Sequence, residues 1–253
     1  MKVSIITVCR NAEKSIEATL KSVAMQTYSE IEYIIIDGKS SDKTLGVIDR
    51  YKENISKIIS EPDKGIYDAM NKGIALAKGD VIIFLNANDT FFALDVLSKA
   101  IELFNKTGSD IIYGDAMMTG KHKNGGHIVK YDRINKWFLL RDTICHQAIF
   151  VKKKLYDDIG KFNLKFKIAA DYEWLLRALI KYKANSAYLN IAVCNYSLDG
   201  ISNDPKNRLA TLMEYDEISK MYFGNFLPLA KKSYNYLLAF AYKVYSSFKK
   251  KSK

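Results

Sequence analysis

Short hydrophobic runs alternate with amphipathic stretches through the first hundred residues of the chain. Runs of apolar residues predict buried strands at 3–8, 31–36, 55–59 and 81–85. Apolar positions three and four residues apart predict helices at 12–25, 45–51 and 66–77. Strands that alternate with helices in this way form a parallel sheet with helices on both faces, so we expect an α/β fold.

The pattern is less regular after residue 100. It predicts a strand at 111–113, a loop or hairpin at 119–126, and a helix that begins near Asp171. After Pro205 the pattern is helical to the end of the chain, so we place the end of the core region between Tyr196 and Pro205.

Polar residues follow directly after four of the predicted strands. These clusters are Arg10–Asn11, Asp37–Asp42, Glu61–Gly65 and Asn86–Asp89. Such residues also make turns and helix caps, and for one cluster alone that is the simpler explanation. Four clusters at one sheet edge instead favour a nucleotide-sized crevice. Because neither a G-x-G-x-x-G nor a P-loop motif occurs, NAD enzymes and P-loop NTPases are not expected.

Charge separates the two ends of the chain. The 253 residues carry a net charge of +11, yet residues 1–100 hold 13 basic and 14 acidic side chains. Residues 227–253 hold seven lysines and no acidic residue, around a stripe of aromatic and apolar positions at helical spacing. A terminal helix packed on the domain is one explanation; we favour an amphipathic helix on an anionic membrane surface. Nucleic acid is not expected as a partner, because only the charge supports it.

The cysteines and the hydrophobic segments limit the location. Cys9, Cys145 and Cys194 are odd in number and widely spaced, which favours a reducing compartment over disulfides or a zinc site. Met1–Cys9 is too short for a signal peptide, and no stretch of about 20 apolar residues would span a membrane. We expect a cytoplasmic protein, peripheral on the inner face of the cell membrane.

The segments that carry the polar clusters resemble glycosyltransferases of family 2. They are residues 3–11, 34–44, 60–73 and 78–89, and the resemblance resumes at 145–150, 169–177 and 199–202. Members most similar to this chain build bacterial exopolysaccharide, capsule and O-antigen units. The resemblance implies an inverting, usually metal-dependent enzyme with the GT-A fold, a mostly parallel Rossmann-like sheet flanked by helices. It implies a GT-A domain at 1–203, with a nucleotide-binding half at about 1–100 and an acceptor-binding half at about 101–203, before a helical extension at 204–253.

The resemblance also assigns the nucleotide site. Thr7, Arg10 and Asn11 would border the nucleotide, and Asp37 and Asp63 would bind the base and ribose, most often of uridine. Lys64 and Asn71 would complete this site, and Asp68 and Lys72 lie on the same donor-facing helix.

The metal motif departs from the family's Asp-x-Asp pattern. It reads Asn86-Ala87-Asn88 at the donor diphosphate, and Asp89 is the carboxylate beside it. Three interpretations remain: Asn88 and Asp89 still hold Mn²⁺ or Mg²⁺, basic side chains replace the metal, or catalysis has been lost. We favour the first, because hard cations prefer oxygen ligands and a diphosphate would supply further oxygens.

The resemblance places the catalytic base at Asp171. From the residues alone this aspartate would more simply cap the helix that follows, with Glu173 solvated or paired with Arg177. His146 and Gln147 would lie near the acceptor. Three aromatic residues are candidates for stacking on sugar rings: Trp137, Tyr172 and Trp174. Core packing is the alternative, above all for Trp174.

These assignments lead to one functional hypothesis and one alternative. The chain would transfer a hexose or N-acetylhexosamine from a UDP-sugar to a hydroxyl of a lipid-linked glycan in surface polysaccharide biosynthesis. The acceptor would be linked to a polyprenyl diphosphate at the membrane surface, where residues 227–253 would bind. The alternative is a non-catalytic protein that binds nucleotide-sugars or glycans and has lost the metal motif.

Overall fold

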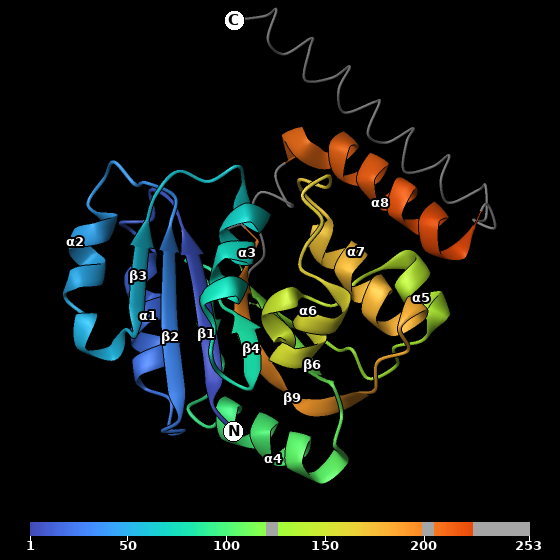
Figure 1. Ribbon diagram of the computed structural model, residues 1–253, viewed down its shortest axis with the longest axis horizontal. Coiled ribbons are helices and arrows are strands. Elements are labelled where there is room, and N and C mark those ends of the chain that lie inside the picture. Colours follow the sequence, from blue (N-terminus) through green and yellow to red (C-terminus); the bar gives the residue numbers. More distant parts are fainter. Residues whose placement is uncertain (120–125, 199–204, 225–253) are drawn as a thin grey trace, which may run out of the picture.

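Four parallel strands form the first half of the sheet. The computed structural model describes residues 1–119, 126–198 and 205–224. The parallel strands, adjacent in the order β3-β2-β1-β4, are β1 (Val3–Cys9), β2 (Ile31–Asp37), β3 (Lys57–Ser60) and β4 (Val81–Phe84). All four strands expected from the hydrophobic runs are present. Their carboxyl ends meet at one edge, at the top in Figure 1.

The second half continues the same sheet with mixed pairing. Its described strands are β5 (Thr90–Phe91), β6 (Ile111–Thr119), β7 (His127–Val129), β8 (Ile149–Lys152) and β9 (Ser186–Ser197). β8 pairs antiparallel with both β4 and β6, and β9 runs parallel to β6. β6 and β7 pair as the arms of the expected hairpin, whose residues 120–125 lie outside the described part. The two halves therefore share one sheet.

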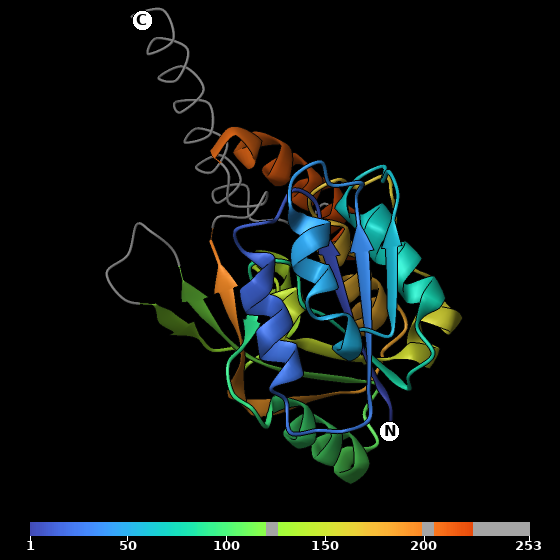
Figure 2. The same ribbon diagram turned by 90° about the vertical axis from the view of Figure 1, so that its left-hand side faces the viewer.

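Helices cover both faces of this sheet, as the alternating pattern predicts. They are α1 (Ile16–Ala24), α2 (Thr44–Asp49), α3 (Ile66–Leu76), α4 (Val96–Thr107), α5 (Lys136–Arg141), α6 (Lys153–Ile159), α7 (Ala170–Leu176) and α8 (Arg208–Phe223). Figures 1 and 2 together show α1 and α3 on opposite faces of the parallel strands. Short turns of 3-10 helix lie at 52–54, 146–148 and 205–207, and α7 continues as π-helix at 177–181.

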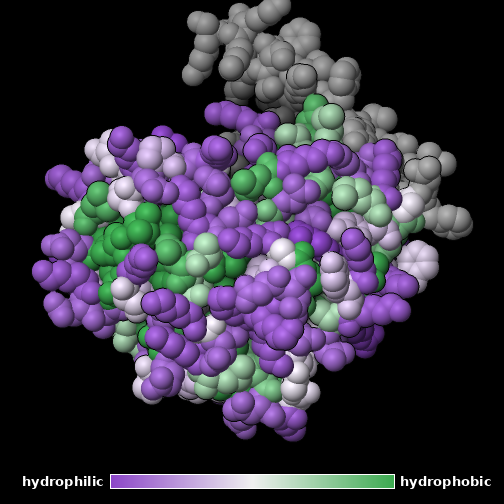
Figure 3. Space-filling model, viewed as in Figure 1, coloured by the Kyte–Doolittle hydropathy of each residue, from purple (hydrophilic) through white to green (hydrophobic). Residues whose placement is uncertain are grey.

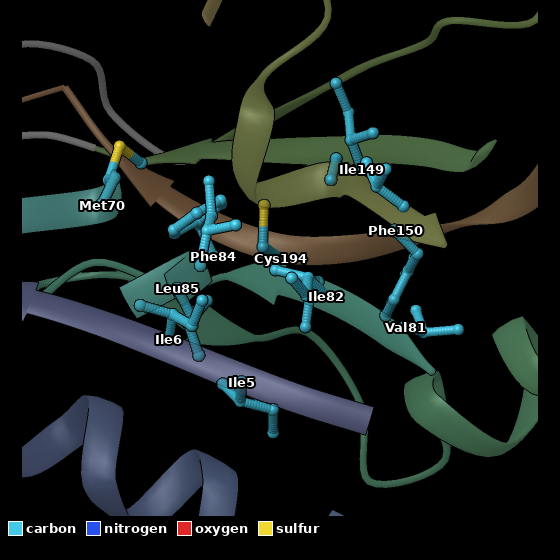
Figure 4. Close-up of a cluster of buried hydrophobic side chains, with 14 of the residues drawn as sticks. Ile5, Ile6, Met70, Val81, Ile82, Phe84, Leu85, Ile149, Phe150 and Cys194 are labelled. Atoms are coloured by element: carbon cyan, nitrogen blue, oxygen red, sulfur yellow. The ribbon is translucent and has the colours of Figure 1, made fainter. Parts of the chain in front are cut away.

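Branched aliphatic side chains of the central strands make the core. Figure 4 shows Ile6 of β1 beside Leu85, and Phe150 of β8 beside Val81 of β4, with Cys194 of β9 between the two groups. α3 packs unusually close to β1, because a Cβ added at Gly73 would lie 2.5 Å from Ile6 Cγ2. Glycine at this position therefore permits the close packing of α3 on β1.

Two aromatic residues considered for sugar binding belong to the core instead. Trp174 is 3% exposed and stacks on Tyr156, with 4.4 Å between ring centroids. Tyr172 is fully buried, stacks on Tyr215 of α8 and donates to the backbone oxygen of Leu139. Stacking on a sugar is therefore excluded for both, as the core-packing alternative predicted for Trp174. Trp137 is 67% exposed.

The C-terminal part is described as far as residue 224. The helix expected after Pro205 is present as α8, and its residues pack on α7, as Figure 1 shows. None of the helices in the described ranges combines the length and apolar character that a membrane span needs. Polar side chains cover most of the face in Figure 3, and hydrophobic ones gather mainly over β2 and β3. The basic stretch 227–253 and the segment 199–202 lie outside the described residues.

Candidate active site

Two adjoining cavities open at the carboxyl ends of the parallel strands. The larger has a volume of about 360 Å³ and the smaller about 290 Å³. They share four lining residues, Val8, Cys9, Arg10 and Ile66. The smaller cavity is completed by Asp63, Gly65 and Ala69. Predicted site residues in the larger one are Asn11, Asn86, Ala87, Asn88, Asp89, His146, Gln147 and Asp171. The structure thus brings most of the predicted residues together.

The loop after β1 is fixed by the loop after β2. The backbone N–H of Asn11 donates to Ser40 Oγ at 2.8 Å, and that of Ala12 donates to Thr44 Oγ1 at 2.7 Å. In return, the backbone N–H of Ser41 donates to Asn11 Oδ1 at 2.9 Å. These bonds hold Arg10 and Asn11 at the mouth of the cavities.

Thr7 and Asp37 do not line either cavity, although both were expected at the nucleotide. Thr7 is fully buried because its side chain points into the sheet, where Oγ1 donates to the backbone oxygen of Leu85. Asp37 is also fully buried, and its carboxylate accepts bonds from Ser40 and Ser60. Both side chains position neighbouring parts of the backbone, and their place at the nucleotide stays a prediction.

Lys64 and Asn71 are likewise outside the two cavity linings. Lys64 is exposed, and the side chain of Asn71 bonds both the backbone N–H and the backbone oxygen of Phe162. Asn71 therefore joins α3 to the segment before α7. Asp63 does line the smaller cavity, and its carboxylate pairs with Lys72 Nζ at 2.6 Å.

The side chains of Asp63 and Arg10 both lie close to Gly38. A Cβ at this position would lie 2.9 Å from Asp63 Oδ2 and 3.3 Å from Arg10 Cδ. We expect Gly38→Ala to weaken UDP binding roughly threefold to tenfold, because the new methyl group must displace one of these side chains. Titration calorimetry with UDP measures this. Gly46→Ala is the matched control, since its Cβ would meet nothing within 4 Å; equal losses in both variants would contradict the prediction.

Asp171 is held by two side chains from other elements. Its Oδ1 accepts from the hydroxyl of Tyr67 at 2.8 Å, and its Oδ2 lies 2.9 Å from His146 Nδ1. With the carboxylate ionised, Nδ1 carries a proton and donates to it, so Nε2 accepts from Asn86 Nδ2 at 3.0 Å. Asp171 lies in the first turn of α7, whose N-cap residue is Ala169, so it is not the cap that its position would otherwise suggest.

The surroundings of Asp171 favour the ionised form of its carboxyl group. Burial raises its pKa, but the hydrogen bonds from His146 and Tyr67 outweigh this, and the net pKa is below the usual value. Burial and the nearby Asp171 charge raise the pKa of Tyr67, so its hydroxyl stays protonated and able to donate. Only 18% of the Asp171 side chain is exposed, and that side faces the larger cavity. A partly enclosed, ionised carboxylate can accept a proton from a hydroxyl group.

We expect Tyr67→Phe to move the acid limb of the rate–pH profile upward by about one pH unit. The variant loses a hydrogen bond that lowers the pKa of Asp171, so protonation of the base occurs at higher pH. The rate near pH 8 should change little. Tyr51→Phe, which loses a hydroxyl bonded to Glu17, is the control. An unmoved acid limb in Tyr67→Phe would refute the assignment.

Asn86, Asn88 and Asp89 differ in what they offer a ligand. Asn88 is exposed, has a left-handed φ of 111° and lines the larger cavity. Asn86 Oδ1 is buried without a hydrogen-bond partner among the described residues. Asp89 is 4% exposed, and its two oxygens accept from Gln147 Nε2 at 2.7 Å and from the Ser197 N–H at 3.0 Å. Burial raises the pKa of its carboxyl group.

This donor set does not fit a divalent cation. Asn86 and Asn88 bring no charge, and Asp89 is a single, buried carboxylate whose oxygens each already accept a hydrogen bond, from Gln147 and from Ser197. In the described ranges, no three His, Cys, Asp or Glu side chains form a cluster that would hold a metal. The expected Mn²⁺ or Mg²⁺ site at Asn88 and Asp89 stays a prediction that the side-chain arrangement does not favour.

Glu173 and Glu214 stabilise the surroundings of Asp171. Glu173 pairs with Arg177 at 2.8 Å, as expected, but is buried rather than solvated. Glu214 of α8 accepts from three successive backbone N–H groups, those of residues 167, 168 and 169. The segment immediately before α7 is therefore bound to α8.

Solved structures with the same arrangement are glycosyltransferases. TarS residues 1–349 from S. aureus, in complex with UDP-GlcNAc, superimposes with a TM-score of 0.69 over 96% of this chain and 72% of that chain, at 19% identity. The mannosyltransferase PcManGT from Pyrobaculum calidifontis, in complex with GDP-Man and Mn²⁺, gives a TM-score of 0.67 over 94% and 69%, at 16% identity. These similarities confirm the GT-A fold.

The sequence model described as "Glycosyl transferase family 2" matches residues 4–167. The chain belongs to glycosyl transferase family 2. A "PGL/p-HBAD biosynthesis glycosyltransferase" of Mycobacterium tuberculosis (strain ATCC 25177 / H37Ra) is 33% identical over 205 residues, which are 79% of this chain and 78% of that protein. The glycosyltransferase AglE of Haloferax volcanii is 26% identical over 188 residues, or 70% and 60%.

Several residues of this family 2 site were not identified from the sequence. Tyr67, Lys167 and Ser197 all line the larger cavity. Tyr67 lies within the family-like segment 60–73, but its contact with Asp171 joins residues far apart in the chain. Lys167 and Ser197 belong to no motif. The separation into domains at 203/204 stays a prediction, since its boundary lies outside the described residues.

Proposed function

We propose that this family 2 protein is an inverting glycosyltransferase that moves a hexose or N-acetylhexosamine from a UDP-sugar to an acceptor hydroxyl. The observation that carries the proposal is the Asp171 carboxylate, ionised and directed into the larger cavity by Tyr67 and His146. An inverting transfer needs one such base on the acceptor side. The complex of TarS with UDP-GlcNAc supports a uridine donor.

The reaction assigns one role to each cavity. The smaller cavity, with Asp63, would hold the nucleoside, and the larger would hold the sugar and the acceptor hydroxyl. Asp171 would take the hydroxyl proton while the acceptor oxygen bonds to the anomeric carbon. The bond between that carbon and the diphosphate breaks at the same time, and its electron pair leaves with the nucleoside diphosphate. Gln147 would contribute through Asp89, which it binds, rather than by free contact with the acceptor.

For the acceptor and the location, we propose a polyprenyl-diphosphate-linked glycan at the cytoplasmic membrane surface. The support is the lysine-rich, aromatic sequence at 227–253. Enzymes that build surface polysaccharides, such as capsule or O-antigen, would use such an acceptor. A protein of this kind would be peripheral on the inner face of the membrane.

A donor panel tests the function. Purified protein is incubated with UDP-, GDP- and dTDP-sugars and short lipid-linked acceptors, with release of nucleoside diphosphate as the readout. We expect acceptor-dependent turnover with a UDP-sugar. Binding of UDP without turnover of any donor would instead support the non-catalytic alternative. Preference for GDP-sugars, as in the PcManGT complex, would correct the donor.

A further inference from the structure

Two cationic residues, Arg10 and Lys167, line the larger cavity, where the metal motif is incomplete. We propose that Arg10 and Lys167 neutralise the diphosphate of the donor, so that donor binding does not require a divalent metal ion. This inference rests on the proposed function. The two residues come from different elements, Arg10 from the loop after β1 and Lys167 from the segment before α7.

Arg10 occupies the place through which a diphosphate must pass. A nucleotide-sugar that spans from Asp63 to Asp171 crosses the lining that the two cavities share. Of those four shared residues, Arg10 alone is charged. Its guanidinium makes no hydrogen bond or ion pair with the residues that the structure describes, so its donors are available. Guanidinium groups bind phosphate oxygens with two parallel hydrogen bonds.

Lys167 adds a second positive charge at a fixed point. Its backbone N–H donates to Glu214 Oε1 at 2.8 Å, which fixes the main chain at this residue. Its ammonium group donates to the Leu164 oxygen at 2.7 Å, which leaves further protons for an anion. Two cations match the two negative charges of a nucleotide-sugar diphosphate.

The carboxylate that would hold a metal has another function. Asp89 joins the end of β4 to Gln147 and to the end of β9 through both of its oxygens. Divalent cations on diphosphates are usually held by more than one charged oxygen ligand, and Asp89 is the single carboxylate of this motif. Here the positive charge comes instead from side chains that already line the cavity.

Titration calorimetry with UDP and with uridine tests this inference. For the wild-type chain, we expect the dissociation constant for UDP to differ by less than about threefold between Mn²⁺ and EDTA. Arg10→Ala and Lys167→Ala should each weaken UDP binding by on the order of tenfold, as expected for the loss of a charge-assisted hydrogen bond. Uridine, which has no phosphate, should bind all three proteins equally well.

Lys14→Ala and Lys161→Ala are the matched controls, because both lysines are exposed and neither lines a cavity. A gain of tenfold or more in UDP affinity with Mn²⁺ that disappears in Asn88→Ala would overturn the inference and leave the proposed function intact. Equal losses for UDP and uridine in Arg10→Ala would also overturn it. Absence of binding to UDP and GDP under all conditions would contradict the proposed function itself, and with it this inference.

Discussion

Asp171→Asn should lower the turnover number by about 10²- to 10⁴-fold while the affinity for UDP changes less than twofold. The amide has the shape of the carboxylate but cannot take the acceptor proton. UDP affinity should survive because Asp171 lines only the larger cavity, whereas Asp63, expected at the nucleoside, lines the smaller one. Nucleoside diphosphate release gives the rate, and calorimetry gives the affinity.

Glu102→Gln is the control for this prediction, because it makes the same chemical change on the exposed side of α4. Its rate should equal that of the wild-type chain. If Asp171→Asn keeps more than a tenth of the wild-type rate, Asp171 is not the base and the inverting mechanism loses its support. The residual rate should also lose the acid limb that Asp171 gives to the wild-type profile, since the variant has no carboxyl group there to protonate.

Asp89→Ala should reduce the free energy of unfolding by about 2–4 kcal/mol, measured by urea denaturation in EDTA. The substitution leaves the amide of Gln147 and the N–H of Ser197 without their acceptor in a buried position. Each unsatisfied buried donor costs about 1–3 kcal/mol. A residue that served only as a metal ligand would not have this effect in the absence of metal.

Asp158→Ala gives the comparison for an exposed aspartate. Its carboxylate pairs with Lys154 on the surface of α6, an interaction worth about 0–1 kcal/mol. An equal, small change in both variants would show that Asp89 is not a structural connection. In that case the metal site at Asn88 and Asp89 would regain support.

Three strands of the parallel half, β1, β2 and β4, could be predicted because they are buried on both faces. β1 and β2 are short, mostly apolar runs rich in branched residues, as is usual for strands of a parallel sheet. β9 could not be identified in this way, since its residues alternate between buried and exposed without a clear period. Its pairing with β6 depends on contacts between segments about 75 residues apart, which no local pattern contains.

In the candidate site, too, some features follow from local sequence and others depend on the folded structure. Sequence position identifies the strand ends, so Arg10, Asp63 and Asn86 were expected where they lie. It does not identify the burial of each side chain: Thr7 and Asp37, expected at the nucleotide, are both fully buried. The support of Asp171 by Tyr67 also required the structure, because α3 and α7 meet only after folding.

The hydrogen bonds that Glu214 accepts limit how far the chain can be truncated from its C-terminal end. A fragment that ends at residue 203 would match the boundary expected from the sequence, but it would remove α8. Three successive N–H groups beside the first turn of α7 would lose their acceptor, and Tyr172 would lose the ring on which it stacks. The smallest fragment with an intact Asp171 therefore has to extend through Phe223, the last residue of α8.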